Sequence, residues 1–318
     1  MTLELLRVRD TKSLSRDEWL EVRRNGIGGS DAAAILGLNR FKGAFSVYAD
    51  KVLGHHDDLS NIEAVYWGNV LEDIVAKEFV RRTGKKAERV NAVLRHPEYE
   101  FIIADLDRRI VGENAVLECK TTNAFNEKEW LKDEVPAAYL CQIQHYMAVT
   151  GADVCYIACL IGGQKFIYKT VLRDDDFIDY LIEREVNFWE NNIRKEIPPE
   201  IDGSRSAERF LKETYPESMD TCICMTSDIE AACRERRDLK NKIREHENRI
   251  KVLDNRIKLA IGENSYAQGR KFSASWVSAK PRRILNTEKL AADYQIENLD
   301  KYYVYSGPNR QLRIKEVK

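Results

Sequence analysis

The sequence predicts a mixed α/β fold, in which a central mixed β-sheet is flanked by helices. The first observation is an apolar, alternating stretch on both sides of a turn, Phe101–Thr122. The second is a further pair of apolar runs, Cys155–Ile161 and Phe166–Val171, which predicts a hairpin. The third is that amphipathic helical patterns, Tyr66–Thr83 and Phe177–Ile193, lie on either side of these strands in the sequence.

The N-terminal part predicts three helices. Trp19–Ser30 has a helical pattern that ends in a glycine-rich turn, and a short helix follows over Ala32–Leu36. Ser30 or Asp31 is a suitable N-cap for this second helix. A third helix is expected over Phe45–Leu53.

The glycine-rich turn is a candidate anion site. Gly26, Gly28 and Gly29 allow the backbone to approach a ligand closely. A helix N-terminus beside Arg23 and Arg24 would attract a phosphate. The alternative is an ordinary corner between two helices with exposed arginines.

Tyr66–Thr83 is the best amphipathic helix in this half of the chain, and Gly84 is a suitable C-cap. Glu72 lies on its flank. That side chain is either a solvated glutamate or an acid directed at a metal site. Lys86–Val93 is expected to form the next strand.

The central stretch holds the strongest chemical signal. Phe101–Ala104 and Val116–Cys119 are predicted to pair as strands, which would bring Asp107 near Glu118. Alternate residues of a strand share a face, so Glu118 and Lys120 are expected to project together.

Two carboxylates and an ammonium group at one position suggest a metal site. Burying them without a partner is costly, and a divalent cation would relieve the repulsion between the carboxylates. Hard oxygen ligands suit Mg²⁺ or Mn²⁺. Lys120 would then orient or activate water, or neutralise developing charge. The alternative is two exposed strands joined by a turn.

The remaining elements of this half follow in order. Asn126–Trp130 begins a charged segment suited to a lid, and Ala137–Val149 is a helix stopped by glycine. Cys155–Ile161 and Phe166–Val171 are strands joined by a glycine-rich turn. Phe177–Ile193 is an amphipathic helix with acidic residues at its start.

We expect a core over residues 1–200, a linker over 201–227 and a separate C-terminal part over 228–318. Asp228–Ile261 predicts a long helix with a coiled-coil seam, which would self-associate, fold back on the core or bind a partner. The seam consists of Leu239, Ile243, His246, Ile250, Leu253, Ile257 and Ala260.

Beyond the long helix, Tyr266–Val277 and Tyr302–Ile314 are expected to be strands around a short helix, Thr287–Tyr294. Basic and aromatic residues mix there, which suits single-stranded nucleic acid or ordinary packing with a basic rim. They are Trp276, Arg282, Arg283, Tyr302, Tyr303, Tyr305, Arg310 and Arg313.

Composition excludes several classes. The formal net charge is −1, so there is no global basic signature. No apolar run approaches a membrane span, and the first residues lack the apolar core of a secretory signal. Seven scattered cysteines argue against a disulfide framework and fit a reducing cytoplasm. The spacing of Cys222, Cys224 and Cys233 is unusual for an iron–sulfur cluster, and His55–Asp58 suits a solvated loop better than a metal site.

Four motifs in this order resemble the YqaJ-type viral recombinases, relatives of lambda exonuclease with a PD-(D/E)xK nuclease fold. The resemblance covers roughly residues 15–200. The motifs are W-x3-R-x6-SD (Trp19, Arg23, Ser30, Asp31), WG-x3-E (Trp67, Gly68, Glu72), D-x10-E-x-K (Asp107, Glu118, Lys120) and Y-x2-Q-x-Q-x-YM-x-VTG (Tyr139 to Gly151).

The resemblance implies roles for individual residues. Asp107 and Glu118 would be metal ligands, with the Cys119 carbonyl oxygen as a third. Lys120 would act on the attacking water, and Glu72 would be a further acid from the preceding helix.

Three more residues receive roles from the same resemblance. Gln142 would help to position the catalytic lysine or the water. Arg23 and Ser30 match the site that grips the 5′-phosphate of DNA, in agreement with the predicted anion site.

Two positions depart from the family pattern. Leu106 replaces the usual proline, and Arg108 stands where glycine is common. These departures leave a choice between Asp105 and Asp107 as metal ligand. Asp107 is favoured because it takes the motif position at a typical distance from Glu118.

The resemblance implies an Mg²⁺-dependent 5′→3′ exonuclease that acts on linear double-stranded DNA and leaves 3′ overhangs for phage or prophage recombination by single-strand annealing. Mn²⁺ would substitute for Mg²⁺. Expected partners are double-stranded DNA ends, a single-strand annealing protein and further copies in a trimeric ring, in the bacterial host cytoplasm and without a membrane. The alternatives are an endonuclease of the same fold and a non-catalytic DNA-binding or scaffold subunit.

Overall fold

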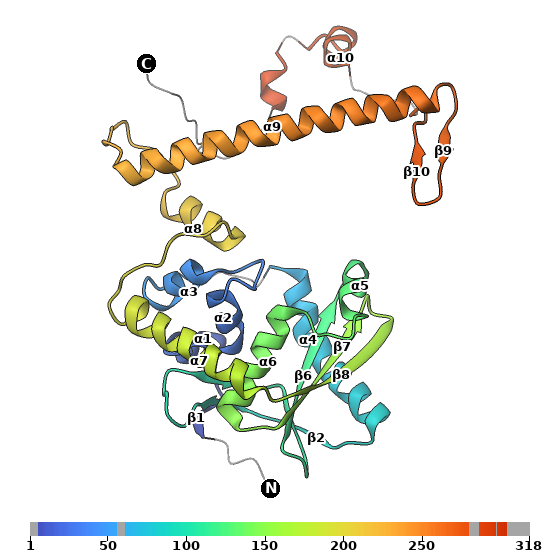
Figure 1. The fold of residues 1–318 in the computed structure, drawn as a ribbon. Coiled ribbons are helices and arrows are strands. Elements are labelled where there is room, and N and C mark those ends of the chain that lie inside the picture. The colour runs from blue at the N-terminus through green and yellow to red at the C-terminus, as the bar shows by residue number, and fades with distance from the viewer. Residues whose placement is uncertain (1–5, 56–60, 280–285, 297, 304–318) are drawn as a thin grey trace. The chain divides into compact units, whose positions relative to one another are not determined.

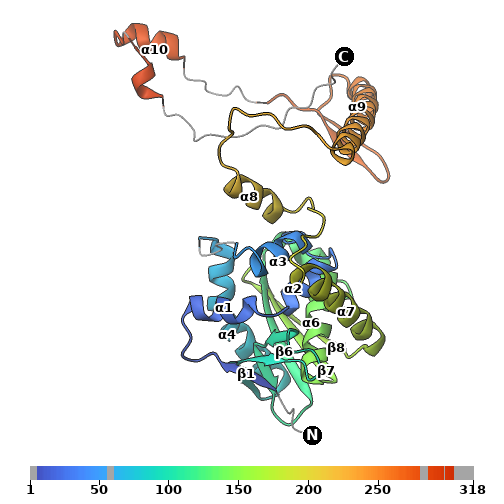
Figure 2. The same cartoon turned by 90° about the vertical axis from the view of Figure 1, so that its left-hand side faces the viewer.

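The structure is a computed structural model, shown in Figures 1 and 2. It describes residues 6–55, 61–279, 286–296 and 298–303 of the 318-residue chain. The chain divides into two compact units, Met1–Thr214 and Tyr215–Lys318.

A five-stranded mixed sheet forms the centre of the first unit. Its strand order is β2-β5-β6-β7-β8, and every neighbouring pair is antiparallel except β6–β7, which is parallel. The parallel pair is connected through helix α6 (Ala137–Thr150). The fold class predicted from the sequence is therefore confirmed. The strands are β2 (Ala87–Arg89), β5 (Arg108–Ile110), β6 (Ala115–Thr122), β7 (Val154–Ile161) and β8 (Lys165–Leu172).

A smaller sheet has the order β1-β3-β4, with β1 at Arg7–Asp10, β3 at Ala92–Arg95 and β4 at Ile103–Asp105. The expected pairing of Phe101–Ala104 with Val116–Cys119 is wrong, because β4 pairs with β3. It is β5 that pairs with β6, so the chain crosses between the sheets just before β5.

The single strand expected over Lys86–Val93 is also divided. Its first part is β2 in the larger sheet, and its last residues lie in β3 of the smaller one. Short apolar runs do not reveal which sheet a strand joins, because each strand gains the same main-chain hydrogen bonds in either sheet.

Helices cover both faces of the larger sheet (Figure 1). Val116 of β6 packs with α6 residues such as Ile143, while Leu117 of β6 packs with Val75 and Phe79 of α4. This alternation follows from the pleat of a strand, and it places Glu118 and Lys120 on the α6 side. The helices of this unit are α1 (Arg16–Arg24), α2 (Gly29–Ile35), α3 (Ala44–Lys51), α4 (Glu63–Thr83), α5 (Glu127–Trp130), α6, α7 (Asp175–Phe188) and α8 (Arg205–Thr214).

Helix ends agree with the sequence in some places and not in others. Gly84 ends α4 with φ +71°, as predicted for a C-cap. Helix α2 begins earlier than expected, because its N-cap is Gly28 rather than Ser30 or Asp31. The segment expected to be a lid folds into a 3₁₀ turn, Ala124–Asn126, and α5, whose Trp130 is buried against Tyr139.

The first unit extends beyond residue 200. Helix α8 lies in the segment that the sequence assigned to a linker, and it packs on α3. The hydroxyl oxygens of Ser46 and Ser206 are 2.6 Å apart in this buried contact. Helix α8 buries only two small residues, Ser206 and Ala207, so most of its residues are polar. That polar composition is why the sequence predicted a linker there.

The second unit is built on the 35-residue helix α9 (Ser227–Ile261), as predicted. The strand expected over Tyr266–Val277 is instead a hairpin of β9 (Tyr266–Gln268) and β10 (Ser273–Ser275). The short helix is present as α10 (Thr287–Asp293), and a 3₁₀ turn covers Asp300–Tyr302.

Several sequence predictions lie outside the described residues. They concern the last strand beyond residue 303, together with Arg282, Arg283, Tyr305, Arg310 and Arg313. Within the described ranges, no helix has both the length and the apolar character to cross a lipid bilayer.

Candidate active site

One cavity of about 400 Å³ brings together most of the residues singled out in the sequence. It lies in the first unit and is lined by residues of α1, α2, α4, α6, β3, β4 and β6 and of the crossing between β4 and β5. Glu72 and Cys119 are not among its lining residues. The predicted residues that line it are Arg23, Ser30, Asp107, Glu118, Lys120 and Gln142.

The two carboxylates are held differently. Asp107 Oδ2 accepts a hydrogen bond of 2.7 Å from the main-chain N–H of Cys119. Glu118 Oε1 lies 2.5 Å from Lys120 Nζ and accepts a 3.0 Å hydrogen bond from Gln142 Nε2. Glu118 Oε2 is buried and has no hydrogen-bond partner in the described structure. Such an oxygen is rare in a protein interior, and a bound cation would satisfy it.

Both carboxyl groups at the site have raised pKa values. Burial and the neighbouring Glu118 raise the pKa of Asp107 well above its ordinary value. Burial also raises the pKa of Glu118, although Lys120 opposes the shift. Burial and nearby negative charge therefore disfavour ionisation of both carboxylates.

Lys120 is held as a cation. Burial alone would lower the pKa of Lys120, but Glu118 and Asp107 outweigh it and raise that pKa. Its ammonium group lies 5.2 Å from the ring centre of Tyr139. A protonated amine in this position can donate hydrogen bonds to an anionic ligand or to water.

Gln142 links the site to Tyr146, which the sequence interpretation did not assign to the site. Gln142 Nε2 donates to the Tyr146 hydroxyl over 2.7 Å as well as to Glu118. The two residues are four apart on α6, so they share a helix face. That spacing was visible in the sequence, but it did not indicate that the shared face would meet a carboxylate.

Glu72 of α4 does not line the cavity but binds two arginines. Its Oε1 accepts hydrogen bonds from Arg108 Nη1 at 2.6 Å and from Arg89 Nη2 at 3.3 Å. Arg108 is buried and also binds the Asp107 carbonyl oxygen at 2.7 Å and Asp73 Oδ1 at 2.5 Å. The arginine at the usual glycine position thus ties α4 to the strand that follows Asp107.

Asp105 and Asp107 both line the cavity. Asp105 Oδ2 accepts a hydrogen bond of 2.8 Å from the indole N–H of Trp19, and burial raises the pKa of Asp105. Asp107 instead binds the main chain beside Glu118. Trp19 of the first motif therefore holds Asp105, the alternative candidate to Asp107 as metal ligand.

Main-chain pairing holds the glycine-rich turn against β4. The Ile27 N–H donates to the Phe101 carbonyl at 2.6 Å, and the Ile103 N–H donates to the Ile27 carbonyl at 2.9 Å. A Cβ on Gly26 would lie 2.7 Å from the Phe101 carbonyl oxygen, which explains the glycine there. This pairing brings the predicted phosphate site to the strand that leads to Asp107.

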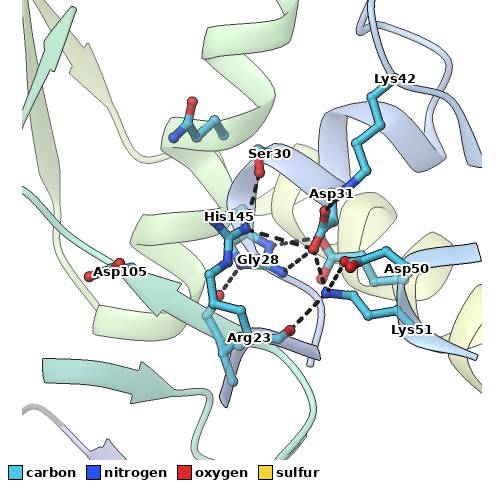
Figure 3. Close-up of polar contacts among 12 residues, drawn as sticks. Arg23, Gly28, Ser30, Asp31, Lys42, Asp50, Lys51, Asp105 and His145 are labelled. Atoms are coloured by element: carbon cyan, nitrogen blue, oxygen red, sulfur yellow. Dashed lines mark hydrogen bonds and ion pairs between the residues drawn. The ribbon is translucent and has the colours of Figure 1, made fainter. Parts of the chain in front are cut away.

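Arg23 and Ser30 meet at this turn (Figure 3). Arg23 Nη2 donates to Ser30 Oγ over 3.2 Å, and a Cβ on Gly28 would lie 2.8 Å from the same nitrogen. Both side chains line the cavity that contains Lys120. The sequence grouped Arg23 with Ser30 correctly, and the structure gives a direct contact between them.

Asp31 is the centre of a buried charge cluster that the sequence did not reveal (Figure 3). Its oxygens lie 2.8 Å from Lys42 Nζ, 3.0 Å from Lys51 Nζ and 3.9 Å from Arg23 Nη2. Burial raises the pKa of Asp31, but these cations outweigh it and hold that pKa well below its ordinary value. Lys51 Nζ also donates to the Arg23 carbonyl at 2.7 Å, so the cluster fixes the end of α1.

His145 of α6 is buried, and each of its two ring nitrogens lies beside an oxygen atom. Its Nδ1 lies 2.8 Å from Glu185 Oε1 and its Nε2 lies 2.8 Å from the Ile103 carbonyl oxygen. A carbonyl can only accept, so the geometry suits an imidazolium that donates from both nitrogens. Burial lowers the pKa of His145, but Glu185 outweighs it and raises that pKa above its ordinary value.

The other possible metal ligands do not assemble. Among the described residues, no three His, Cys, Asp or Glu side chains form a group that could hold a metal ion. His55 Nε2 lies 3.1 Å from Glu213 Oε2, and residues 56–58 lie outside the described structure. A metal held by Asp107 and Glu118 would therefore need main-chain or water oxygens as further ligands.

The fold and the site together define a mixed α/β protein with two buried carboxylates and a lysine at one cavity. Residues 18–153 match the family model of the YqaJ-like viral recombinase domain. Protein YqaJ of Bacillus subtilis (strain 168) is 46% identical over 283 residues, which cover 87% of this chain and 88% of that protein. The chain belongs to the YqaJ-like viral recombinase family.

Two solved structures match part of this chain. The alkaline exonuclease LHK-Exo from Laribacter hongkongensis is 18% identical with a TM-score of 0.49, over 62% of this chain and 97% of that chain. A phage-related exonuclease from Haemophilus somnus 129PT is 14% identical with a TM-score of 0.43, over 62% of this chain and all of that chain (100%).

Proposed function

We propose that this protein is an Mg²⁺-dependent exonuclease that degrades the 5′-terminated strand of linear double-stranded DNA and leaves 3′ overhangs for phage or prophage recombination. The observation that carries the proposal is the unpartnered Glu118 Oε2, buried in the cavity that also contains Asp107 and Lys120. Two buried carboxylates with raised pKa values and one unsatisfied oxygen suit a divalent cation.

The residues present fit such a metal. Asp107 and Glu118 would hold it with the Cys119 carbonyl oxygen, and Mn²⁺ would substitute for Mg²⁺ because both prefer oxygen ligands. When bound, the ion would lower the pKa of water and stabilise negative charge on a phosphodiester. Binding would also lower the pKa values of both carboxylates.

The chain's own side chains would orient the reactants. The Lys120 ammonium group, held as a cation, would donate to water or to a phosphate oxygen as charge develops there. Gln142 would keep Lys120 and Glu118 in place through its hydrogen bond to Glu118. Glu72 would act in two ways. It binds Arg108, and its negative charge raises the pKa of Asp107.

The phosphate site would select the DNA end. Arg23 and Ser30 line the same cavity as the carboxylates, and Arg23 offers a charged donor fork that suits a terminal 5′-phosphate. Binding of the terminal phosphate next to the reacting position would favour release of nucleotides from a DNA end. A single-strand annealing protein of the same recombination system would then bind the exposed 3′ strand.

Further aspects of the proposal rest on the family resemblance. We propose a trimeric ring around DNA, and action in the cytoplasm of a bacterial host. A ring would keep the protein on its substrate between cleavage events, so it predicts processive digestion.

Digestion of three DNA substrates with Mg²⁺ tests the proposal. Linear duplexes with a 5′-phosphate, linear duplexes with a 5′-hydroxyl and covalently closed circles should be compared. We expect release of mononucleotides from 5′-phosphorylated ends and intact circles. Cutting of the circles would identify an endonuclease instead. Binding without cleavage of any substrate would support a scaffold role and overturn the proposal.

A further inference from the structure

The apolar seam of α9 is exposed in the second unit. Its five large aliphatic side chains are between 42% and 56% exposed, and Ile261 is the only buried residue of the described helix. A regular apolar stripe of this length on an isolated helix normally packs against another helix. The five side chains are Leu239, Ile243, Ile250, Leu253 and Ile257.

The order of the apolar residues indicates how many helices a coiled coil of α9 would contain. The steps along the seam alternate between four and three residues, which sets Ile243, Ile250 and Ile257 at the a positions of a heptad repeat. Leu239 and Leu253 take d positions. Isoleucine at a with leucine at d favours two parallel strands.

The charged residues beside the seam complement a second copy of the same helix. In a parallel pair, each g residue faces the e residue five positions later on the partner helix. Of the four g–e pairs along the seam, three are of opposite charge: Glu235 with Lys240, Lys242 with Glu247, and Arg249 with Asp254. The fourth, Arg256 with Ile261, holds a single charge.

The antiparallel arrangement is disfavoured by the same residues. There g faces g and e faces e. With position 257 opposite position 239, Arg249 and Glu247 would each meet their own copies and Lys242 would meet Arg256, so these like charges outweigh the one opposite pair, Lys240 with Asp254. His246, the polar residue inside the seam, meets its own copy only when the helices are parallel and in register. A single polar layer of this kind fixes the register of a coiled coil.

We propose that α9 binds α9 of a second copy of this chain as a parallel, in-register, two-stranded coiled coil over residues 239–260. This contact uses the second unit alone and does not depend on the proposed nuclease activity.

Charge reversal on the full-length protein tests the pairing. Lys242→Glu puts Glu against Glu247 of the partner, and Glu247→Lys puts Lys against Lys242, so each variant alone should weaken association about tenfold. An equimolar mixture restores opposite charges at both contacts. Sedimentation velocity over a dilution series should show each single variant falling to half the wild-type mass at about tenfold higher concentration than the wild type, and the mixture should follow the wild type.

The control is Asn248→Glu, which changes charge at a position facing away from the partner and should keep the wild-type mass. Circular dichroism should show the same helix content in all variants. Single variants that retain the wild-type mass at every concentration, or a mixture that stays at half mass, would overturn the proposal.

Cross-linking tests the orientation. Ile257→Cys, with Cys222, Cys224 and Cys233 changed to serine, should give an oxidised covalent dimer, because parallel helices bring the two positions together. Asn255→Cys faces away and should not cross-link. In an antiparallel pair position 257 would lie opposite position 239, so absence of a dimer for Ile257→Cys would exclude the parallel arrangement.

Discussion

Lys51 Nζ lies 3.0 Å from Asp31 Oδ2, and each of these side chains is only 1% exposed. The same ammonium group binds the Arg23 carbonyl, and the same carboxylate accepts the Gly28 N–H at 3.2 Å. The pair therefore joins α3 to both sides of the turn that holds Arg23 against Ser30. Its position suggests that the proposed phosphate site is set by a buried ion pair.

Asp31→Asn should destabilise the protein strongly. The change keeps the shape of the side chain but leaves the buried Lys51 ammonium group without a full negative charge. Loss of one partner of a buried pair costs about 3–5 kcal/mol. Urea unfolding measures this value. Glu100→Gln, which breaks an exposed pair with Arg95, should change the free energy of unfolding little, and equal effects would contradict the assignment.

His145 should make stability depend on pH. Its folded-state pKa is raised, so the folded state retains the proton to higher pH than the unfolded state. The stabilisation is therefore complete below the unfolded pKa of about 6.5 and is lost as pH rises through the folded pKa. We expect His145→Gln to show a smaller fall in the free energy of unfolding between about pH 6 and about pH 9 than wild type. Equal slopes for the two proteins would refute the imidazolium assignment.

Lys120→Ala should retain DNA binding and lose cleavage. Removal of one donor that stabilises developing charge typically costs about 10²–10³ in rate. Nucleotide release measures cleavage, and fluorescence anisotropy measures binding. The control is Lys165→Ala, which removes an exposed lysine paired with Glu127. Hydrolysis at the wild-type rate in Lys120→Ala would exclude the proposed role.

Gly28→Ala should weaken the preference for a 5′-phosphate. The added Cβ would lie 2.8 Å from Arg23 Nη2, so the guanidinium group must move away from Ser30. The ratio of kcat/KM for 5′-phosphorylated and 5′-hydroxyl duplexes should fall about tenfold. Gly203→Ala, where a Cβ would meet nothing within 4 Å, should leave the ratio unchanged. An unaltered ratio in Gly28→Ala would place the phosphate elsewhere.

Mg²⁺ should stabilise the protein against heat through Glu118. A ligand at a hundred times its Kd stabilises the folded state by about 2.7 kcal/mol, which raises Tm. Glu118→Gln removes the charge of the proposed ligand and should abolish this rise in Tm. Thermal unfolding with and without Mg²⁺ measures the effect independently of activity. Glu88→Gln, on the exposed edge strand β2, should keep it. A persistent rise in Glu118→Gln would argue against this metal site.

Local pattern alone located most elements of the first unit. The periodicity of α4 and α6, the C-cap at Gly84 and the hairpin of β7 and β8 were all predicted, because each depends on residues near one another in the chain. The motif around Glu118 also indicated correctly that Lys120 shares its face. The metal, the polarity of digestion and the ring stay predictions.

Long-range pairing and the partners of buried charges were decided only by the tertiary structure. Strand β5, rather than Phe101–Ala104, pairs with β6, and neither choice changes the local apolar pattern. Asp31, read from the sequence as a possible N-cap, neutralises Lys51 from a separate helix. The sequence by itself determined the candidate residues and their spacing, since residue type and spacing are local. Their partners depend on burial and distance, which exist only once the chain has folded.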